Sequence, residues 1–113
     1  MARTDVGTVD DLHASATKAC GLDDFGTDDD NYREALAVLL DSFARDAELT
    51  EFGSKMNRFF VRNALVARLV SEAAFKQYPE HADVAIERPI FVTGLPRTGT
   101  TALHRLLAAD PRH

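Results

Sequence analysis

The sequence has a single cysteine, no tryptophan and four prolines among its 113 residues. Because Cys20 stands alone, no disulfide can form within the chain, and we expect a cytoplasmic location. The longest apolar runs, such as residues 35–40, are far shorter than the roughly 18 residues needed to span a bilayer, so no transmembrane segment is expected. The first residues also lack the basic and then apolar order of a secretory signal.

Basic residues are also scarce, with 13 Lys and Arg against 18 Asp and Glu and a formal net charge of -5. This balance argues against nucleic-acid binding, which depends on clustered Lys and Arg. The charge is uneven, however. From Arg88 to His113 four arginines stand against Asp110 alone. That end of the chain therefore favours a small anionic ligand, on a chain whose 45% hydrophobic and 27% charged residues are typical of a globular protein.

Local signals predict a first helix over residues 9–20. Thr8 followed three residues later by Asp11 resembles a capping box, and Gly21 stands where a C-terminal cap glycine belongs. The apolar positions of this helix are Val9, Leu12, Ala16 and Ala19. Because these side chains are mostly small, we expect the helix to be weakly packed.

Helical spacing of apolar residues predicts two more helices, over residues 29–48 and 52–77. We interpret Asp28, Asp29 and Asp30 as an N-terminal cap and solvated charge, because they lack the ligand spacing of a calcium loop. Thr50 is the expected cap of the longer helix. The predicted core stripes are Tyr32, Leu36, Leu39, Leu40, Phe43 and Ala47 in one helix and Met56, Phe59, Phe60, Ala64, Ala67, Val70 and Ala74 in the other.

Two groups on the long helix have alternative interpretations. Met56, Phe59 and Phe60 could line a pocket for an apolar acceptor, but residues at this spacing are more often helix-packing core, which is the prediction. The cationic residues of the other face are Lys55, Arg58, Arg62, Arg68 and Lys76. They could contact an anion, but we expect them to face solvent.

The fold class follows from residues 79–113. Residues 79–88 have no sustained hydrophobic periodicity, so they are predicted to be a connecting segment with one short strand near residues 84–86. Residues 89–93 are β-branched and aromatic after a proline, which predicts a parallel-sheet strand. A glycine-bounded loop and an apolar helical pattern follow, ending at Asp110-Pro111. We therefore predict an α/β protein: a helical leader over residues 1–88, and the beginning of an incomplete P-loop-like parallel-sheet domain over residues 89–113.

The loop has the residue types of a phosphate site. The N-terminus of a helix presents unpaired N–H groups, and a glycine at its entrance lets an anion approach the backbone. Here Gly99 stands at that entrance, Thr100 and Thr101 add hydroxyls, and Arg97 adds a permanent charge. The spacing from Gly94 to Gly99 matches a Walker A loop, but Thr100 stands where nucleotide-hydrolysing enzymes have Lys. ATP or GTP hydrolysis is therefore disfavoured.

The run Pro96-Arg97-Thr98-Gly99-Thr100-Thr101 resembles the 5'-phosphosulfate loop of sulfotransferases, and residues 90–111 are most similar to the bacterial branch of that family. The resemblance implies 3'-phosphoadenylyl sulfate as donor, a hydroxyl or amine acceptor and no metal. It assigns nucleotide binding to Pro96, Arg97, Thr98, Gly99, Thr100 and Thr101, and charge stabilisation in catalysis to Arg97. Ala102 departs from the Trp of many eukaryotic members, so adenine stacking is not implied. The family also uses a His or Glu base, but His104 is expected to be an ordinary helix residue.

The chain is interpreted as an N-terminal piece of such an enzyme, inactive alone, because it offers no second strong strand and no 3'-phosphate site. The implied partners are the sulfated nucleotide and a small-molecule, lipid or sugar acceptor. Oligomeric state is left open. Two alternatives remain: a P-loop kinase or other nucleotide-binding enzyme, and a small helical interaction module.

Overall fold

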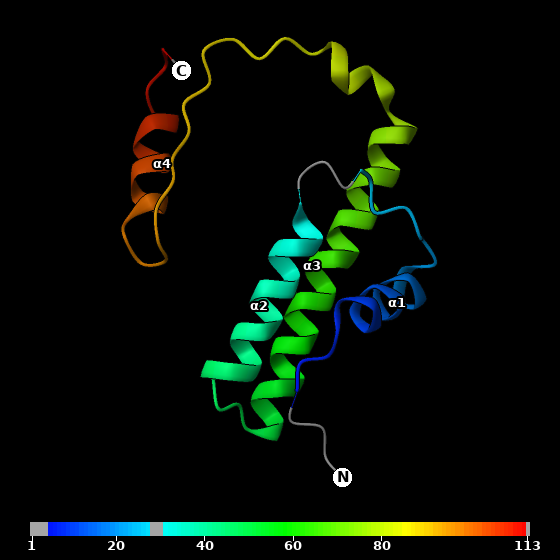
Figure 1. The fold of residues 1–113 in the computed structure, drawn as a ribbon. Helices are drawn as coiled ribbons and strands as arrows, with labels where there is room; N and C mark the ends of the chain where they lie inside the picture. The colour runs from blue at the N-terminus through cyan, green and yellow to red at the C-terminus, as the bar shows by residue number, and fades with distance from the viewer. Residues whose placement is uncertain (1–4, 28–30, 113) are drawn as a thin grey trace. The chain divides into compact units, whose positions relative to one another are not determined.

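The structure, a computed structural model, describes residues 5–27 and 31–112. Its elements are α1 (Val9–Cys20), α2 (Tyr32–Asp46), α3 (Glu51–Gln77), a 3₁₀ turn (Pro79–Asp83) and α4 (Thr100–Ala108) (Figure 1). The chain divides into two units, residues 1–82 and 83–113. No helix within the described residues is long and apolar enough to cross a membrane.

The ends of α1 are set by the residues that the sequence indicated. The Thr8 hydroxyl accepts the Asp11 N–H at 3.1 Å, and the Asp11 carboxylate accepts the Thr8 N–H at 3.4 Å, so the capping box is complete. At the other end Gly21 has a φ of 73° and donates its N–H to the Thr17 carbonyl at 2.8 Å. The predicted bounds of this helix are confirmed.

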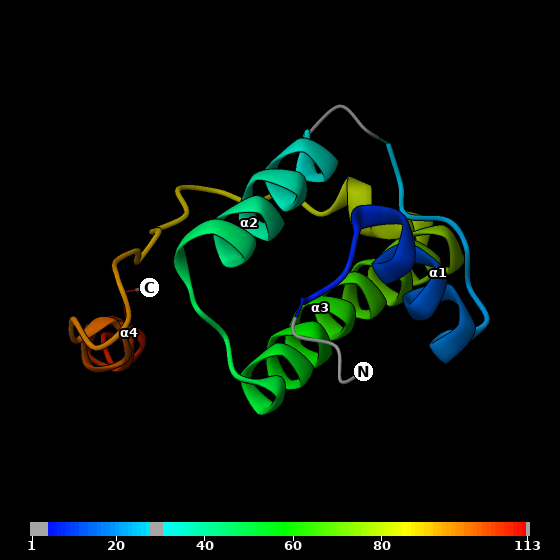
Figure 2. The same ribbon diagram turned by 60° about the horizontal axis from the view of Figure 1, so that its bottom comes forward.

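The prediction of weak packing for α1 is wrong. Leu12 and Ala16 are fully buried, and they form one core with Leu36 of α2 and with Leu65 and Leu69 of α3. α1 packs closely against α3, as Figure 2 shows. Helix separation depends on the side chains at the contact, and small residues allow two helices to approach closely. A stripe of small residues therefore marks close packing here.

α2 is shorter than the predicted 29–48 helix. Its N-terminal cap is Asn31, which has a φ of 51° and gives no side-chain cap hydrogen bond. The expected capping run, Asp28 to Asp30, lies outside the described residues. Of the predicted stripe only Leu36 is buried, while Leu39 is 43% exposed.

α3 confirms its predicted bounds and its Thr50 cap but buries a different face. The Thr50 hydroxyl accepts the Gly53 N–H at 3.0 Å. The buried residues of α3 are Ser54, Leu65 and Leu69. Phe59 and Phe60 are 45% and 61% exposed, so their assignment to the core is wrong. Apolar residues occur on both sides of this helix, and helical periodicity alone does not distinguish one side from the other.

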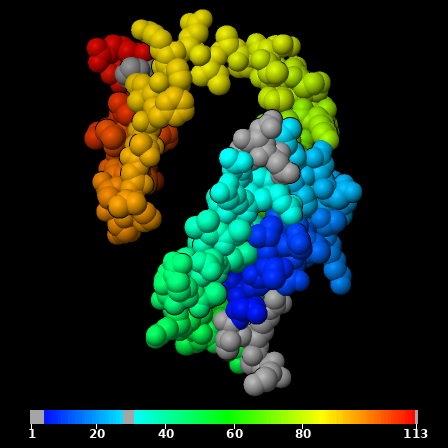
Figure 3. Space-filling view, viewed as in Figure 1, coloured from blue at the N-terminus to red at the C-terminus, as the bar shows by residue number. Residues whose placement is uncertain are grey.

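The cationic residues of α3 bind the segments that flank α1. The expectation that they face solvent is wrong for Arg58 and Arg68, which are half-buried, whereas Lys76 is exposed. The guanidinium of Arg58 donates to the Val6 carbonyl at 3.0 Å, and that of Arg68 donates to the Phe25 carbonyl at 2.6 Å. The ammonium of Lys76 forms an ion pair with Asp24. The segment before α1 also lies beside α2 in the space-filling view (Figure 3, blue beside cyan and green).

The predicted α/β fold class is wrong. Over residues 5–27 and 31–112 the structure contains helices and no strand, so neither residues 89–93 nor residues 84–86 form the predicted strand. A strand needs the backbone of a neighbouring strand to accept and donate its hydrogen bonds. No described segment supplies that neighbour, and Phe91 of the extended run is 84% exposed. Residues 83–112 are thus an extended segment, a turn and α4.

Candidate functional site

The loop between residues 94 and 99 is closed by a contact between its two ends. The Thr98 hydroxyl donates to the Leu95 carbonyl at 2.6 Å. A Cβ atom placed on Gly94 would lie 2.7 Å from the Thr98 Oγ1 and 3.1 Å from the Thr100 Cγ2. Any larger residue at 94 would therefore push Thr98 out of its place in the turn.

Two residues of left-handed backbone, separated by Thr98, lead into α4. Arg97 has a φ of 69° and Gly99, the N-terminal cap of α4, has a φ of 88°. For a residue with a Cβ atom this conformation costs about 1–2 kcal/mol, and such strain is concentrated at functional sites. The conformation directs the chain so that the first turn of α4 follows the loop directly.

The N-terminus of α4 is open. Gly99 provides no side-chain cap, and a Cβ atom built on it would meet no atom within 4 Å. The first N–H groups of a helix have no acceptor within the helix, and they carry the positive end of its dipole. Thr100 and Thr101 form the first turn, so two hydroxyls lie beside these N–H groups. This donor set suits an oxyanion.

Arg97 differs from Arg112 of the same unit. It is exposed, and it forms no ion pair with any residue in the described ranges. Arg112, by contrast, binds the Asp110 carboxylate through two nitrogens at 3.0 and 2.7 Å. These hydrogen bonds lower the pKa of Asp110 and raise the pKa of Arg112. Arg97 is thus available to a ligand, whereas the guanidinium of Arg112 is already bound to the Asp110 carboxylate.

His104 lies away from the loop. It lines a hollow of about 590 Å³ together with Arg88, Arg112 and the apolar side chains of the extended segment and α4, and none of the residues from 94 to 101 belongs to it. The residues from Pro96 to Thr101 lie together because they are consecutive in the sequence. His104 does not belong to this group of predicted site residues.

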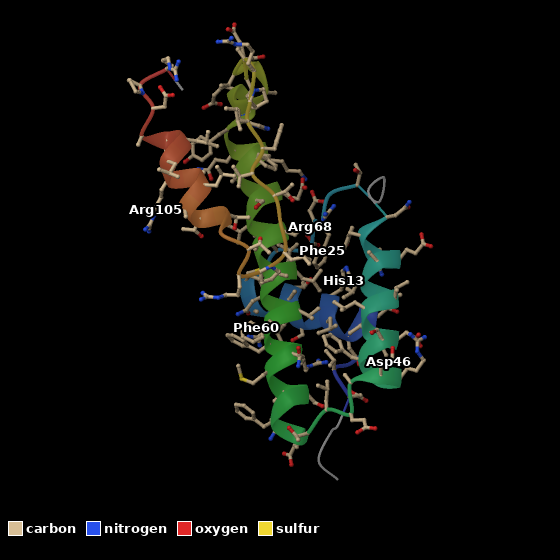
Figure 4. All side chains as sticks on the ribbon, turned by 90° about the vertical axis from the view of Figure 1, so that its left-hand side faces the viewer. His13, Phe25, Asp46, Phe60, Arg68 and Arg105 are labelled. Carbon is tan, nitrogen blue, oxygen red and sulfur yellow. The ribbon has the colours of Figure 1, made fainter. Side chains whose placement is uncertain are left out.

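A buried histidine was not indicated by the sequence. His13 of α1 is 7% exposed, and its Nδ1 lies 2.7 Å from the Val9 carbonyl while its Nε2 lies 2.9 Å from the Tyr32 hydroxyl. Its ring also contacts Phe25, with centroids 4.5 Å apart, as the side-chain view shows (Figure 4). Both ring nitrogens have partners, so His13 joins α1 to α2 and is not placed to act on a substrate. No local sequence pattern predicts a hydrogen bond between residues as distant as His13 and Tyr32.

Comparisons with known proteins agree on one family. The profile of the sulfotransferase family matches residues 89–113. Among solved structures, the chain is similar to sulfotransferase STF1 from Mycobacterium tuberculosis H37Rv, with 77% sequence identity and a TM-score of 0.89 over 98% of this chain. The chain spans 30% of the length of that protein. No curated protein matches the chain.

The family profile falls on the segment that contains the open loop, and the solved sulfotransferase is similar over both units. The chain is thus similar to sulfotransferases both in the family profile at residues 89–113 and over nearly its whole length in the solved structure, as its resemblance indicated.

Proposed function

We propose that this chain is part of a sulfotransferase that moves a sulfuryl group from 3'-phosphoadenylyl sulfate to a hydroxyl or amine acceptor. Residues 89–113 carry the donor site in this proposal, and residues 1–88 are a helical part before it. The observation that carries the proposal is the open N-terminus of α4 beside an unpaired Arg97. The family match at residues 89–113 supports the same assignment.

In the proposed site, the residues Pro96, Arg97, Thr98, Gly99, Thr100 and Thr101 hold the 5'-phosphosulfate end of the donor. The N–H groups at the start of α4 and the two threonine hydroxyls donate to the 5'-phosphate oxygens. Arg97 contacts the 5'-phosphate and the oxygen that bridges it to sulfur. Thr98 closes the turn through its bond to Leu95, and thereby fixes the direction of these donors.

The reaction is an in-line displacement at sulfur. The bond between sulfur and the bridging oxygen breaks while the acceptor oxygen or nitrogen bonds to sulfur, and the acceptor proton leaves to a base. The bonding electrons remain on the bridging oxygen, so negative charge accumulates on the departing 5'-phosphate. Arg97 and the N–H groups of α4 offset this charge in the transition state. The proposal assigns no base to this chain, and we expect residues 1–113 alone to be inactive.

The test uses a chimera in which residues 1–113 replace the aligned part of the M. tuberculosis sulfotransferase. Calorimetry measures its affinity for 3'-phosphoadenylyl sulfate. We expect Arg97→Ala to weaken binding about 10- to 100-fold, since a hydrogen bond to a charged group contributes about 1.5–3 kcal/mol. Arg105→Ala is the matched control, because Arg105 lies in the last turn of α4 and is exposed.

Two results would contradict the proposal. One is an affinity of the Arg97→Ala chimera within twofold of the parent. The other is a parent chimera that binds ATP with magnesium but not the sulfated nucleotide, which would favour the kinase-like alternative.

A further inference from the structure

α3 has an apolar stripe on the side that faces away from the core. We define the outer stripe as Phe52, Met56, Phe59, Phe60, Ala67 and Val70. Phe52, Met56, Phe60, Ala67 and Val70 follow one another at spacings of four, four, seven and three, and Phe59 follows Met56 by three, so they lie on one side of the helix. Phe52, Phe60 and Val70 are 73%, 61% and 52% exposed. In Figure 4 the side chain of Phe60 leaves α3 on the side away from α2.

The polar residues of α3 do not form a solvent-facing side opposite its core. Arg58 and Arg68 reach across the core side to the carbonyls of Val6 and Phe25, and Lys76 pairs with Asp24. Arg58 and Arg68 are therefore half-buried on the core side of α3, whereas Lys55 and Lys76 stay exposed, and the aromatic residues Phe52, Phe59 and Phe60 are exposed as well. A helix that is apolar on both sides is typical of a helix inside a larger protein. Contiguous exposed apolar residues mark an interface.

The apolar surface continues into a groove beside α2. A hollow of about 400 Å³ lies between α2 and α3 and is lined mainly by apolar side chains, with Leu36 and Leu39 on one wall and Val61 and Ala64 on the other. Ala64 follows Phe60 by one helical turn, so the groove adjoins the outer stripe. Aromatic residues are enriched in the buried centres of interfaces, and Phe59 and Phe60 already pack edge to face with centroids 5.7 Å apart.

The comparison with the solved sulfotransferase indicates what covers this surface. The chain matches that protein over nearly all of its own length but spans only 30% of it, so the larger part of a protein of that kind lies outside residues 1–113. We propose that the outer stripe is the surface on which that remaining polypeptide docks, through apolar side chains of its own. A segment of the same polypeptide docks at a high effective concentration, whereas a second copy must offset the loss of free translation and rotation.

The test measures whether the outer stripe is covered in the longer protein. In a Cys20→Ser background, single cysteines replace Phe60 or Val70 in the outer stripe. Lys55→Cys is the matched control, because Lys55 lies on the same helix, its side chain is 68% exposed, and it is outside the stripe. The rate of maleimide labelling is measured for each variant in residues 1–113 alone and in the chimera described above. Circular dichroism confirms that each variant keeps its helix content and unfolds cooperatively.

We expect the thiols of Phe60→Cys and Val70→Cys to react at least about tenfold more slowly in the chimera than in residues 1–113, since a covered thiol reacts only after local opening. Lys55→Cys should react equally in both. Equal labelling of Phe60→Cys in both proteins would overturn the proposal.

A second measurement does not depend on the chimera. If sedimentation shows that residues 1–113 form a discrete dimer, and Phe60→Asp but not Lys55→Asp dissociates it, a second copy is the occupant and the proposal is wrong. Neither measurement involves the nucleotide, so this inference and the proposed donor site fail independently.

Discussion

Arg68 joins the segment after α1 to α3, and its removal should destabilise the first unit. Its guanidinium donates to the Phe25 carbonyl at 2.6 Å and to the Thr27 carbonyl at 3.2 Å, and it lies 3.9 Å from the centre of the Tyr32 ring. A hydrogen bond from a charged donor contributes about 1.5–3 kcal/mol when buried, and a partly exposed cation–π contact about 0.5–1 kcal/mol. The Thr27 bond is exposed and contributes less.

We therefore expect Arg68→Ala to lower the free energy of unfolding by about 2–4 kcal/mol. The measurement is urea denaturation of residues 1–113, followed by the helical circular dichroism signal. Arg68→Lys should lie between parent and Ala, because an ammonium keeps the charge but cannot span both carbonyls.

Arg45→Ala is the control for loss of a cation. Arg45 forms exposed ion pairs with Asp41 and Asp46 on α2, and exposed pairs of this kind contribute only about 0–1 kcal/mol. If Arg68→Ala changed the free energy of unfolding by no more than Arg45→Ala does, the role assigned to Arg68 in holding the Phe25 segment would be refuted.

Two further predictions concern the ends of α1 and the ion pair beyond it. Gly21→Ala should lower the free energy of unfolding by about 1–2 kcal/mol in the same urea assay, because a φ of 73° is strained for a residue with a Cβ atom. Ser15→Ala, the control substitution within α1, should cause no such loss of stability. Equal losses for the two variants would contradict the role assigned to the left-handed backbone at Gly21. The hydrogen bond from Lys76 lowers the pKa of Asp24 below 3.8, so its contribution is present above that pH and is lost as the pH falls through the lowered value. Asp24→Asn should therefore reduce the loss of stability as the pH falls below 4, and an unchanged pH profile would show that Asp24 contributes nothing to it.

The features that the sequence predicted correctly depend on neighbouring residues. Thr8, Asp11 and Gly21 lie within one short segment, and their hydrogen bonds are made inside it, so the bounds of α1 follow from local signals. Thr50 predicts the start of α3 for the same reason. The family resemblance is also local, since the six residues from Pro96 to Thr101 are consecutive and need no tertiary information; that these residues bind a nucleotide stays a prediction.

The features that the sequence predicted wrongly depend on distant residues. The positions of α1 and its flanking segments decide which side of α3 is buried. Because apolar residues occur on both sides of α3, helical periodicity alone does not predict the buried side. A strand over residues 89–93 would need a pairing partner, which a local apolar pattern does not provide. His13 and Tyr32 are 19 residues apart, and nothing in either neighbourhood predicts that they meet.

The contacts that hold α1 in place also determine when it can fold during synthesis. Its flanking segments are bound by Arg58 and Lys76, in each case 52 residues further along the chain. A helix of 12 residues is only marginally stable by itself in water. At a translation rate of about 5–20 residues per second, the ribosome needs roughly 3–10 seconds to add those residues. During that interval α1 has its own capping box and only α2 to pack against, so the first unit is complete only after most of α3 has left the exit tunnel.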